Sequence, residues 1–266
     1  MIMRNLYEKQ YPGHVSTFSV GSVQFGTDFV HIAGPCAVEC EQGLQKLAQQ
    51  LEPDIFRGGV FKARTSPYSF TGLGEKGLTY LEQVGQQRQK PILVEFLTPE
   101  QIDLYSSRVD MIQIGARNMY NYPLLQKAAQ SNKPVLLKRH FSATLDEFLN
   151  AAEYILAEGN DNVLLCERGI RTFETRYRNC LDLSGVTVLK QITHLPVLVD
   201  PSHAAGDSSI VVKLALAAVC AGADGLVIEV HPNPIESLSD APQAITPIQF
   251  RFLRKKVEKL LGFLNL

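Results

Sequence analysis

The sequence lacks the features that mark several large protein classes. Its longest uncharged apolar stretch, Leu214 to Ala223, is too short to span a bilayer, and its first ten residues contain no apolar signal core. Its five cysteines are odd in number and scattered, which disfavours a disulfide framework. It also lacks a basic excess, because 26 Lys and Arg face 27 Asp and Glu. We therefore expect a cytoplasmic protein that binds neither nucleic acid nor membranes.

What the sequence does contain is a repeated pattern of short apolar runs. Hydrophobic residues make up 45% of the 266 residues, which is enough for a large core. The runs are mostly apolar and do not alternate with polar residues, as expected for strands buried on both faces of a parallel sheet. There are eight of them: Phe29–Ala33, Ile55–Phe61, Ile92–Phe96, Met111–Ile114, Val135–Leu137, Val163–Leu165, Val197–Val199 and Leu226–Val230.

The stretches between the runs carry helix signals. Polar N-cap residues, some with a following proline or a Glu or Gln three residues on, precede several of them: Thr98-Pro99 with Gln101, Thr144 with Glu147, Asp207 or Ser208, and Thr246-Pro247. The chain from Phe29 onward gives about 30 residues per unit, the size of a strand with its crossover helix. This predicts a (β/α)8 TIM barrel. A doubly wound open sheet is the alternative, but no Gly-rich dinucleotide fingerprint follows the first strand.

A hairpin is predicted ahead of the barrel. The runs Thr17–Val20 and Val23–Phe25 flank Gly21-Ser22, which suits a two-residue turn. Because the hairpin precedes the first barrel strand, we expect it to close the N-terminal end of the barrel. Residues 1–28 would then form a tail and hairpin, and residues 29–266 the catalytic barrel. With so short a segment before the barrel, we expect no feedback inhibition by Tyr or Phe through an added domain.

Basic residues gather at several of the predicted strand ends, where a barrel places its active site. They are Arg57, Lys62, Arg64, Arg117, Lys138 and Arg168. Six cations at one mouth would repel one another unless anions lie among them. Arginine binds phosphate and carboxylate through bidentate contacts, and lysine acts as a point charge. Glycines beside them (Gly58-Gly59, Gly115, Gly169) allow close approach of a ligand. We infer a substrate site for more than one anionic group, such as two phosphates.

A second set of strand-end residues could bind a metal ion. Cys36, His203 and Glu229 each follow or end a different strand. A thiolate, an imidazole and a carboxylate suit a borderline divalent ion such as Mn, Fe, Co or Zn. No local spacing of the CxxC kind supports the site, so the residues alone leave a structural role for Cys36 open.

The strand-end motifs resemble class I 3-deoxy-D-arabino-heptulosonate 7-phosphate (DAHP) synthase, in the subfamily close to 3-deoxy-D-manno-octulosonate 8-phosphate (KDO8P) synthase. The resemblance covers about Val15 to Phe263, and the motifs occur in the family's order. They are AGPCAVE (33–39), GGVFKARTSPYSFTGLGEKGL (58–78), QIGARNM (113–119), LLKR (136–139), LLCERGIRTFE (164–174), VDPSHAAG (199–206) and VIEVHPNP with SLSDAPQ (227–243).

The resemblance implies condensation of phosphoenolpyruvate (PEP) with D-erythrose 4-phosphate and water, the first step of the shikimate pathway. It implies one divalent metal ion with the ligands Cys36, His203, Glu229 and Asp240. Lys62 would donate a proton to the forming alkoxide, and Glu95 would position a water near PEP. A homotetramer is implied as well.

The resemblance also assigns the anion-binding residues. The PEP phosphate would be held by Arg117, Lys138, Arg168 and the Ala116 amide. The PEP carboxylate would be held by Arg57 and Lys62. The phosphate of the aldose would be held by Arg64, Thr65 and Ser66.

Three other functions stay open. A KDO8P synthase would use arabinose 5-phosphate or another aldose phosphate, but that branch has Lys-Ala-Asn-Arg-Ser-Ser after the second strand, where this chain has Lys62-Ala63-Arg64-Thr65-Ser66. A Schiff-base aldolase would use Lys138 as its nucleophile. A non-catalytic phosphosugar sensor would need no metal. Departures from the family pattern at Ala63, His140 and Ala241 leave room for an altered aldose preference.

Overall fold

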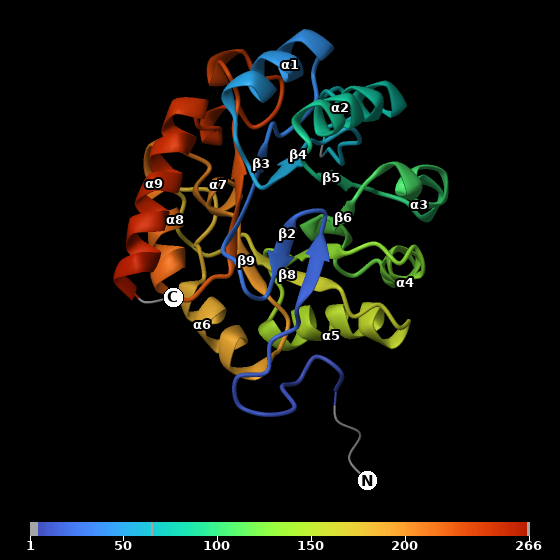
Figure 1. Cartoon of the computed structure of the whole chain (residues 1–266), viewed down its shortest axis with the longest axis vertical. Helices are drawn as coiled ribbons and strands as arrows, with labels where there is room; N and C mark the ends of the chain where they lie inside the picture. Colours follow the sequence, from blue (N-terminus) through green and yellow to red (C-terminus); the bar gives the residue numbers. More distant parts are fainter. Residues whose placement is uncertain (1–4, 65, 265–266) are drawn as a thin grey trace.

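The computed structural model describes residues 5–64 and 66–264, and its centre is a closed barrel of eight parallel strands (Figure 1). The first barrel strand, β3, pairs with the last, β10, from Val30 opposite Gly225 to Gly34 opposite Glu229. This confirms the predicted TIM barrel. The strands are β3 (Val30–Gly34), β4 (Ile55–Arg57), β5 (Ile92–Glu95), β6 (Met111–Ile114), β7 (Val135–Lys138), β8 (Val163–Glu167), β9 (Val197–Val199) and β10 (Gly225–Glu229).

The second predicted strand, Ile55–Phe61, was too long. Strand β4 ends at Arg57, and Gly58-Gly59 then turn the chain away from the sheet. A Cβ atom at Gly59 would collide with the carbonyl oxygen of Cys36, so only glycine allows the two loops to approach this closely. The apolar residues Val60 and Phe61 therefore belong to the loop that carries Lys62 to the mouth of the barrel.

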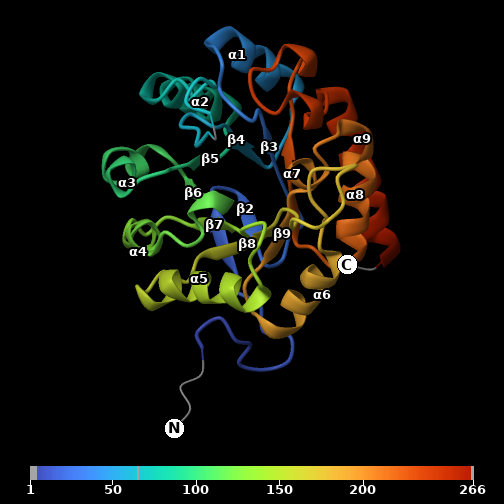
Figure 2. The ribbon, with the colours of Figure 1, turned by 180° about the vertical axis from the view of Figure 1, so that it is seen from behind.

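Helices surround the barrel on its outer face (Figures 1 and 2). They are α1 (Glu41–Gln50), α2 (Glu75–Arg88), α3 (Pro99–Tyr105), α4 (Tyr122–Gln130), α5 (Leu145–Ala157), α6 (Leu183–Ile192), α7 (Pro201–Ala205), α8 (Ser208–Cys220) and α9 (Pro247–Leu264). The short α7 is an addition that directly follows β9. Among residues 5–64 and 66–264, no helix is both long and apolar enough to cross a membrane.

The predicted caps begin the helices as expected. Thr144 and Glu147 form a reciprocal capping box at the start of α5. The side chain of Thr98 accepts a hydrogen bond from the Gln101 amide, and Asp207 caps α8. Each cap satisfies an amide at a helix start that has no partner inside the helix.

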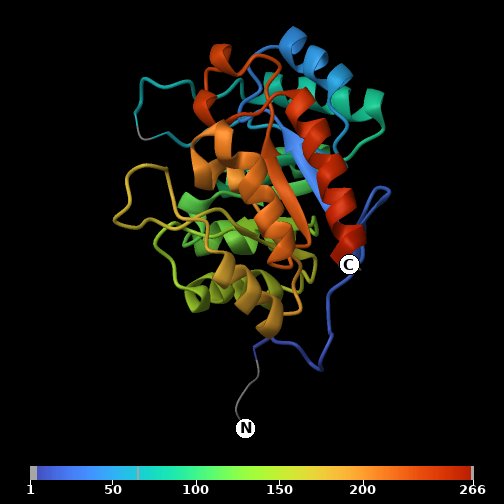
Figure 3. The same cartoon turned by 90° about the vertical axis from the view of Figure 1, so that its left-hand side faces the viewer.

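The hairpin β1 (Phe18–Val20) and β2 (Val23–Phe25) forms as predicted, with Val20 opposite Val23. Its apolar side chains join a core cluster inside the barrel. The cluster includes Val20, Val23, Phe25, Ile32, Leu93, Met111, Leu136, Leu164 and Leu198. Figure 3 shows the hairpin on one side of the barrel and the loops that follow β4 and β8 on the other. The hairpin therefore closes the end of the barrel opposite the strand ends that carry the basic residues.

Candidate active site

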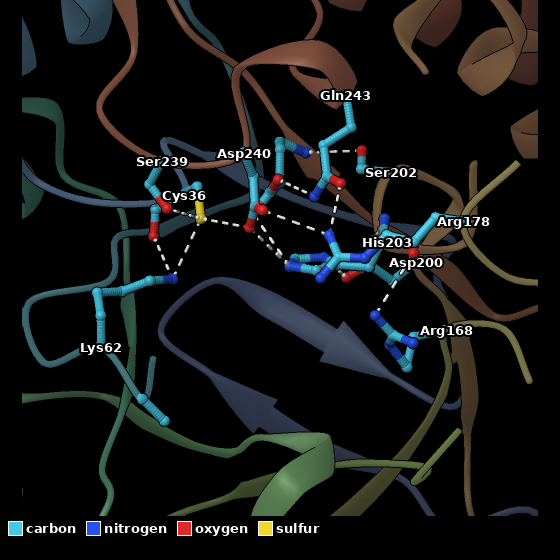
Figure 4. Close-up of polar contacts among 12 residues, drawn as sticks. Cys36, Lys62, Arg168, Arg178, Asp200, Ser202, His203, Ser239, Asp240 and Gln243 are labelled. Carbon is cyan, nitrogen blue, oxygen red and sulfur yellow. Dashed lines mark hydrogen bonds and ion pairs between the residues drawn. The ribbon is translucent and has the colours of Figure 1, made fainter. Parts of the chain in front are cut away.

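Four possible metal ligands meet at the C-terminal end of the barrel (Figure 4). Cys36 follows β3, Glu229 ends β10, and His203 lies in α7. Asp240 lies in the loop after β10, where its backbone adopts a left-handed conformation with φ of 54°. Their ligand atoms all lie within 4.8 Å of one another. The structure thus brings together the three residues predicted from their chemistry and the one implied by resemblance.

Hydrogen bonds hold each of these side chains in place. Glu229 is completely buried, and it accepts bonds from Arg57 Nη1 at 2.9 Å and Gln243 Nε2 at 2.5 Å. His203 Nδ1 lies 2.7 Å from Asp200 Oδ2, which leaves Nε2 facing Glu229 Oε1 at 3.3 Å. Arg57 and Gln243 therefore hold the carboxylate of Glu229 in place, and Asp200 holds the imidazole of His203, before any ligand binds.

The donor set suits a divalent cation. Burial, together with the charge of Glu229, raises the pKa of the Cys36 thiol to about 12. Burial alone would raise the pKa of Asp240, but His203 and the hydrogen bond from Cys36 lower it to about 2. A cation at this point would favour the thiolate of Cys36 beside two carboxylates and an imidazole. Borderline ions such as Zn, Fe, Co and Mn prefer this mixture of ligands.

A cavity of about 310 Å³ opens beside the four ligands. It is strongly basic, since most predicted anion-binding residues line it. Those lining it are Arg57, Lys62, Arg64, Ala116, Arg117, Lys138 and Arg168, with Glu95, His203 and Asp240. Cys36 and Glu229 do not line it and are buried. Ser66 is exposed and lies outside the lining, and Thr65 lies outside the described residues.

The cations of the cavity differ in how they are held. Lys138 donates to the buried carboxylate of Asp200 at 2.5 Å. Arg117 Nη1 donates to the Ala63 carbonyl at 3.5 Å, and Arg168 donates to the carbonyls of Gly169 and His203, each at 3.4 Å. Within the described part of the chain, neither arginine has a carboxylate partner. Both guanidinium groups therefore remain available to an anionic ligand.

Glu95 enters the cavity from the end of β5. Its carboxylate packs against Gly115, where any Cβ atom would collide with Glu95 Oε1. Gly115 is thus needed to leave room for the carboxylate, which lines the same cavity as the cations.

Several residues at the site were not predicted. Arg178 donates to Asp240 Oδ1 at 3.3 Å and to Gln243 Oε1 at 2.8 Å. Arg171 lies over the ring of Phe141, 4.3 Å from its centroid, and both residues line the cavity. Ser239 Oγ lies 3.0 Å from Cys36 Sγ. Asp200, Ser239 and Arg171 fall inside the quoted motifs, each within three residues of a predicted site residue, so their position was a usable signal. Arg178 falls outside every motif and carried no such signal.

His140 fills space beside the site. Its ring packs on Phe141 at a centroid distance of 4.0 Å and lies 5.4 Å from the ring of Tyr120. Burial and the nearby Arg168 lower its pKa. Phe141 lines the cavity, and His140 packs behind it without being part of the lining.

Known proteins resemble this chain over nearly its whole length. The sequence model of the DAHP synthetase I family matches residues 15–262. A phospho-2-dehydro-3-deoxyheptonate aldolase from Thermotoga maritima is 44% identical over 98% of this chain and 78% of its own length. A 2-dehydro-3-deoxyphosphooctonate aldolase from Geotalea uraniireducens is 33% identical, over 92% of this chain and 98% of its own.

Solved structures agree with the sequence comparison. The crystal structure of the Thermotoga maritima phospho-2-dehydro-3-deoxyheptonate aldolase (DAHP synthase) superimposes with a TM-score of 0.94 at 42% identity, covering 98% of this chain and 78% of the other. A truncated form of 3-deoxy-D-arabino-heptulosonate 7-phosphate synthase from the same organism gives a TM-score of 0.91 at 40% identity, covering 98% and 97%.

Proposed function

Because the chain belongs to the DAHP synthetase I family, we propose that it condenses PEP with D-erythrose 4-phosphate and water to give DAHP and phosphate. This is a carbon–carbon bond-forming transferase reaction and the first step of the shikimate pathway. One observation carries the proposal: a basic cavity adjoins a partly buried four-ligand cluster, and Lys62 contacts both. PEP and erythrose 4-phosphate together bring two phosphates, a carboxylate and an aldehyde oxygen to be polarised, and this set of groups requires both features.

The metal ligands in this proposal are Cys36, His203, Glu229 and Asp240, which would hold one divalent Mn, Fe, Co or Zn ion. When bound, the ion supplies Lewis acidity toward the aldehyde oxygen of the second substrate. The donor chemistry supports such an ion without selecting one of the four metals.

Different basic residues bind the different anionic groups of the two substrates. Arg117, Lys138 and Arg168, with the Ala116 amide, bind the PEP phosphate. Arg57 uses Nη1 to bind Glu229, and its remaining N–H groups and Lys62 bind the PEP carboxylate. Arg64, Thr65 and Ser66 bind the aldose phosphate. Because each anionic group has its own binding residues, both substrates are held in fixed positions, with C3 of PEP near the aldehyde carbon. This lowers the entropic cost of bringing the two carbon atoms together.

The residues of the cavity then support each step. C3 of PEP attacks the aldehyde carbon, and positive charge develops at C2 of PEP. Lys62 donates a proton to the alkoxide that forms from the aldehyde oxygen. A water positioned by Glu95 adds to C2, and the resulting hemiketal phosphate loses inorganic phosphate by cleavage of the C–O bond. The arginines stabilise the phosphate throughout.

A KDO8P synthase-like reaction with arabinose 5-phosphate is the second candidate, supported by relatives named 2-dehydro-3-deoxyphosphooctonate aldolase at 33% identity. The Schiff-base alternative has less support. A nucleophilic lysine must be neutral, whereas Lys138 donates to a buried carboxylate at 2.5 Å.

The test supplies PEP with four-carbon and five-carbon aldose phosphates, with and without each metal, and measures phosphate release. We expect release to require metal and to be fastest with erythrose 4-phosphate. Faster release with arabinose 5-phosphate would favour the second candidate. A borohydride-trapped adduct on Lys138 would favour the aldolase, and neither release nor an adduct with any aldose would favour a sensor.

Three further statements stay predictions. They are the homotetramer, the cytoplasmic location, and the assignment of residues 29–266 as the catalytic domain. The oligomer is tested by light scattering during size-exclusion chromatography, where a single species of four times 29.5 kDa is expected.

A further inference from the structure

We propose that Asp200 is a positioning residue that couples the binding of an anion at Lys138 to the binding of a metal ion at His203. The proposal rests on the proposed function, since it takes the PEP phosphate as the anion. Asp200 itself belongs to neither the predicted metal ligands nor the predicted substrate-binding residues. It lies directly after β9, is completely buried, and caps the short helix α7.

One oxygen atom of Asp200 serves both subsites. Oδ2 accepts a hydrogen bond from Lys138 Nζ at 2.5 Å and lies 2.7 Å from His203 Nδ1. Oδ1 accepts from the His203 backbone amide at 2.9 Å. Figure 4 shows Asp200 adjoining His203 on the side of the ring away from Asp240. The carboxylate is therefore shared between a cation of the cavity and a ligand of the metal cluster.

This sharing fixes the state of the imidazole. A carboxylate at Nδ1 holds the ring proton there, so Nε2 keeps its lone pair. Nε2 is the nitrogen that faces the other ligands, with Glu229 Oε1 at 3.3 Å and Asp240 Oδ2 at 3.7 Å. Such carboxylate partners of a ligating histidine typically contribute 10–100-fold to metal affinity.

The same geometry predicts coupling between the two subsites. An anion that binds Lys138 Nζ draws that ammonium away from Asp200, so more of the carboxylate's charge is available to His203. The imidazole then becomes a stronger electron-pair donor at Nε2. Metal and anion should each tighten the binding of the other by the same factor, as linkage requires.

The chain offers a matched control at the other end of the barrel. Asp224 precedes β10 and accepts two bonds from Lys190 Nζ, at 2.6 and 2.7 Å, and one from the Val197 amide at 2.7 Å. It is likewise a carboxylate shared by a lysine and a backbone amide, but it contacts neither the cavity nor the four ligands. Asp224→Asn therefore reports the effect of losing such a carboxylate away from the site.

The experiment measures the dissociation constant of Zn²⁺ for the apoprotein by competition with a chromophoric chelator, with and without saturating PEP. We expect PEP to tighten Zn²⁺ binding several-fold in the wild type and in Asp224→Asn. In Asp200→Asn we expect Zn²⁺ binding to weaken by about 10–100-fold. We also expect the effect of PEP to fall below twofold in this variant. Wild-type Zn²⁺ affinity in Asp200→Asn, or an undiminished effect of PEP, would overturn the proposal.

A second variant carries the test if Asp200→Asn does not fold. Lys138→Met leaves Asp200 to His203 alone, so Zn²⁺ should bind at least as tightly as in the wild type, with no further gain at saturating PEP. If the gain persists, the coupling does not pass through Lys138 and Asp200, and the proposal fails. Formation of DAHP by the wild type is assayed separately, so a failure of the proposed function is distinguished from a failure of the coupling.

Discussion

Lys62 Nζ lies 3.1 Å from Cys36 Sγ and 2.9 Å from the carbonyl oxygen of the same residue. Through this contact, one side chain joins the basic cavity to the cluster of four possible metal ligands. Burial by itself would lower the pKa of Lys62, but Cys36 and Glu95 raise it above its ordinary value. The side chain is therefore an ammonium group within reach of the proposed metal ligands, as the proposed proton donor to an alkoxide must be.

Replacing Lys62 with Met should remove the proton donor while keeping most of the side-chain volume. We expect kcat for phosphate release to fall by about 10²–10⁴-fold, the usual contribution of a general acid. The matched control is Lys76→Met on α2, an exposed lysine that lies over the Tyr80 ring. Both variants should show the wild-type circular dichroism spectrum, and near-normal turnover of Lys62→Met would refute the assignment.

Removing the thiol of Cys36 should weaken metal binding, whereas removing the thiol of Cys40 should not. Cys36→Ala should lose tight binding of Zn²⁺ and with it nearly all activity, because a cluster short of one ligand holds the ion less strongly. Cys40→Ser is the control, since Cys40 is exposed and only caps α1 through the Gly43 amide, a role that serine also fills. Metal content after dialysis, measured by elemental analysis, decides the matter. Equal metal content in Cys36→Ala and the wild type would contradict the ligand assignment.

The sequence predicted the barrel because strands buried on both faces leave continuous apolar runs. All eight runs overlap the observed strands. The end of β4 was missed because the loop continues with Val60 and Phe61, which are apolar for a different reason. They pack against the core outside the sheet, in a loop whose close approach to Cys36 at Gly59 the apolar pattern does not reveal.

The predicted site residues that lie at strand ends were brought together because parallel strands of a barrel end on one face. The partners that orient them could not be assigned roles in the same way. Asp200 stands three residues before a predicted ligand, but its bond to Lys138 depends on the spacing of β7 and β9 across the barrel mouth. Arg178 reaches Asp240 across 62 residues of sequence, a contact that no local pattern encodes.

The capping box of α5 should contribute measurably to stability. Thr144→Ala removes the acceptor for the Glu147 amide, which lies 3.2 Å from Thr144 Oγ1. We expect the free energy of unfolding to fall by about 1 kcal/mol. Urea denaturation followed by circular dichroism measures the change. Thr144→Ser, which keeps the hydroxyl, should have a free energy of unfolding close to that of the wild type. An equal loss in the two variants would show that the hydroxyl's hydrogen bond is not what stabilises the protein at this position.

His31 should make stability depend on pH. The residue is only 6% exposed, and neither ring nitrogen has a hydrogen-bond partner within residues 5–64 and 66–264. Burial lowers its pKa below 6.5, although the nearby Asp54, 3.4 Å from Nδ1, opposes the shift. The folded protein therefore binds a proton less readily at His31 than the unfolded chain does. Its neutral form favours folding fully above pH 6.5, and this contribution declines as the pH falls below that value.

His31→Phe removes the titrating group without opening a cavity, because the ring already packs between Phe29 and Phe250, at centroid distances of 5.2 and 6.2 Å. We expect the wild type to lose free energy of unfolding between pH 7.5 and 5.5, and the variant to lose less over the same interval. Burial also lowers the pKa of His140 and His203, so the wild-type slope contains their contributions, and only the difference between the two proteins reports on His31. Urea denaturation at half-unit pH steps measures that difference. Parallel curves for the two proteins would mean that His31 takes up a proton equally well in the folded and unfolded states.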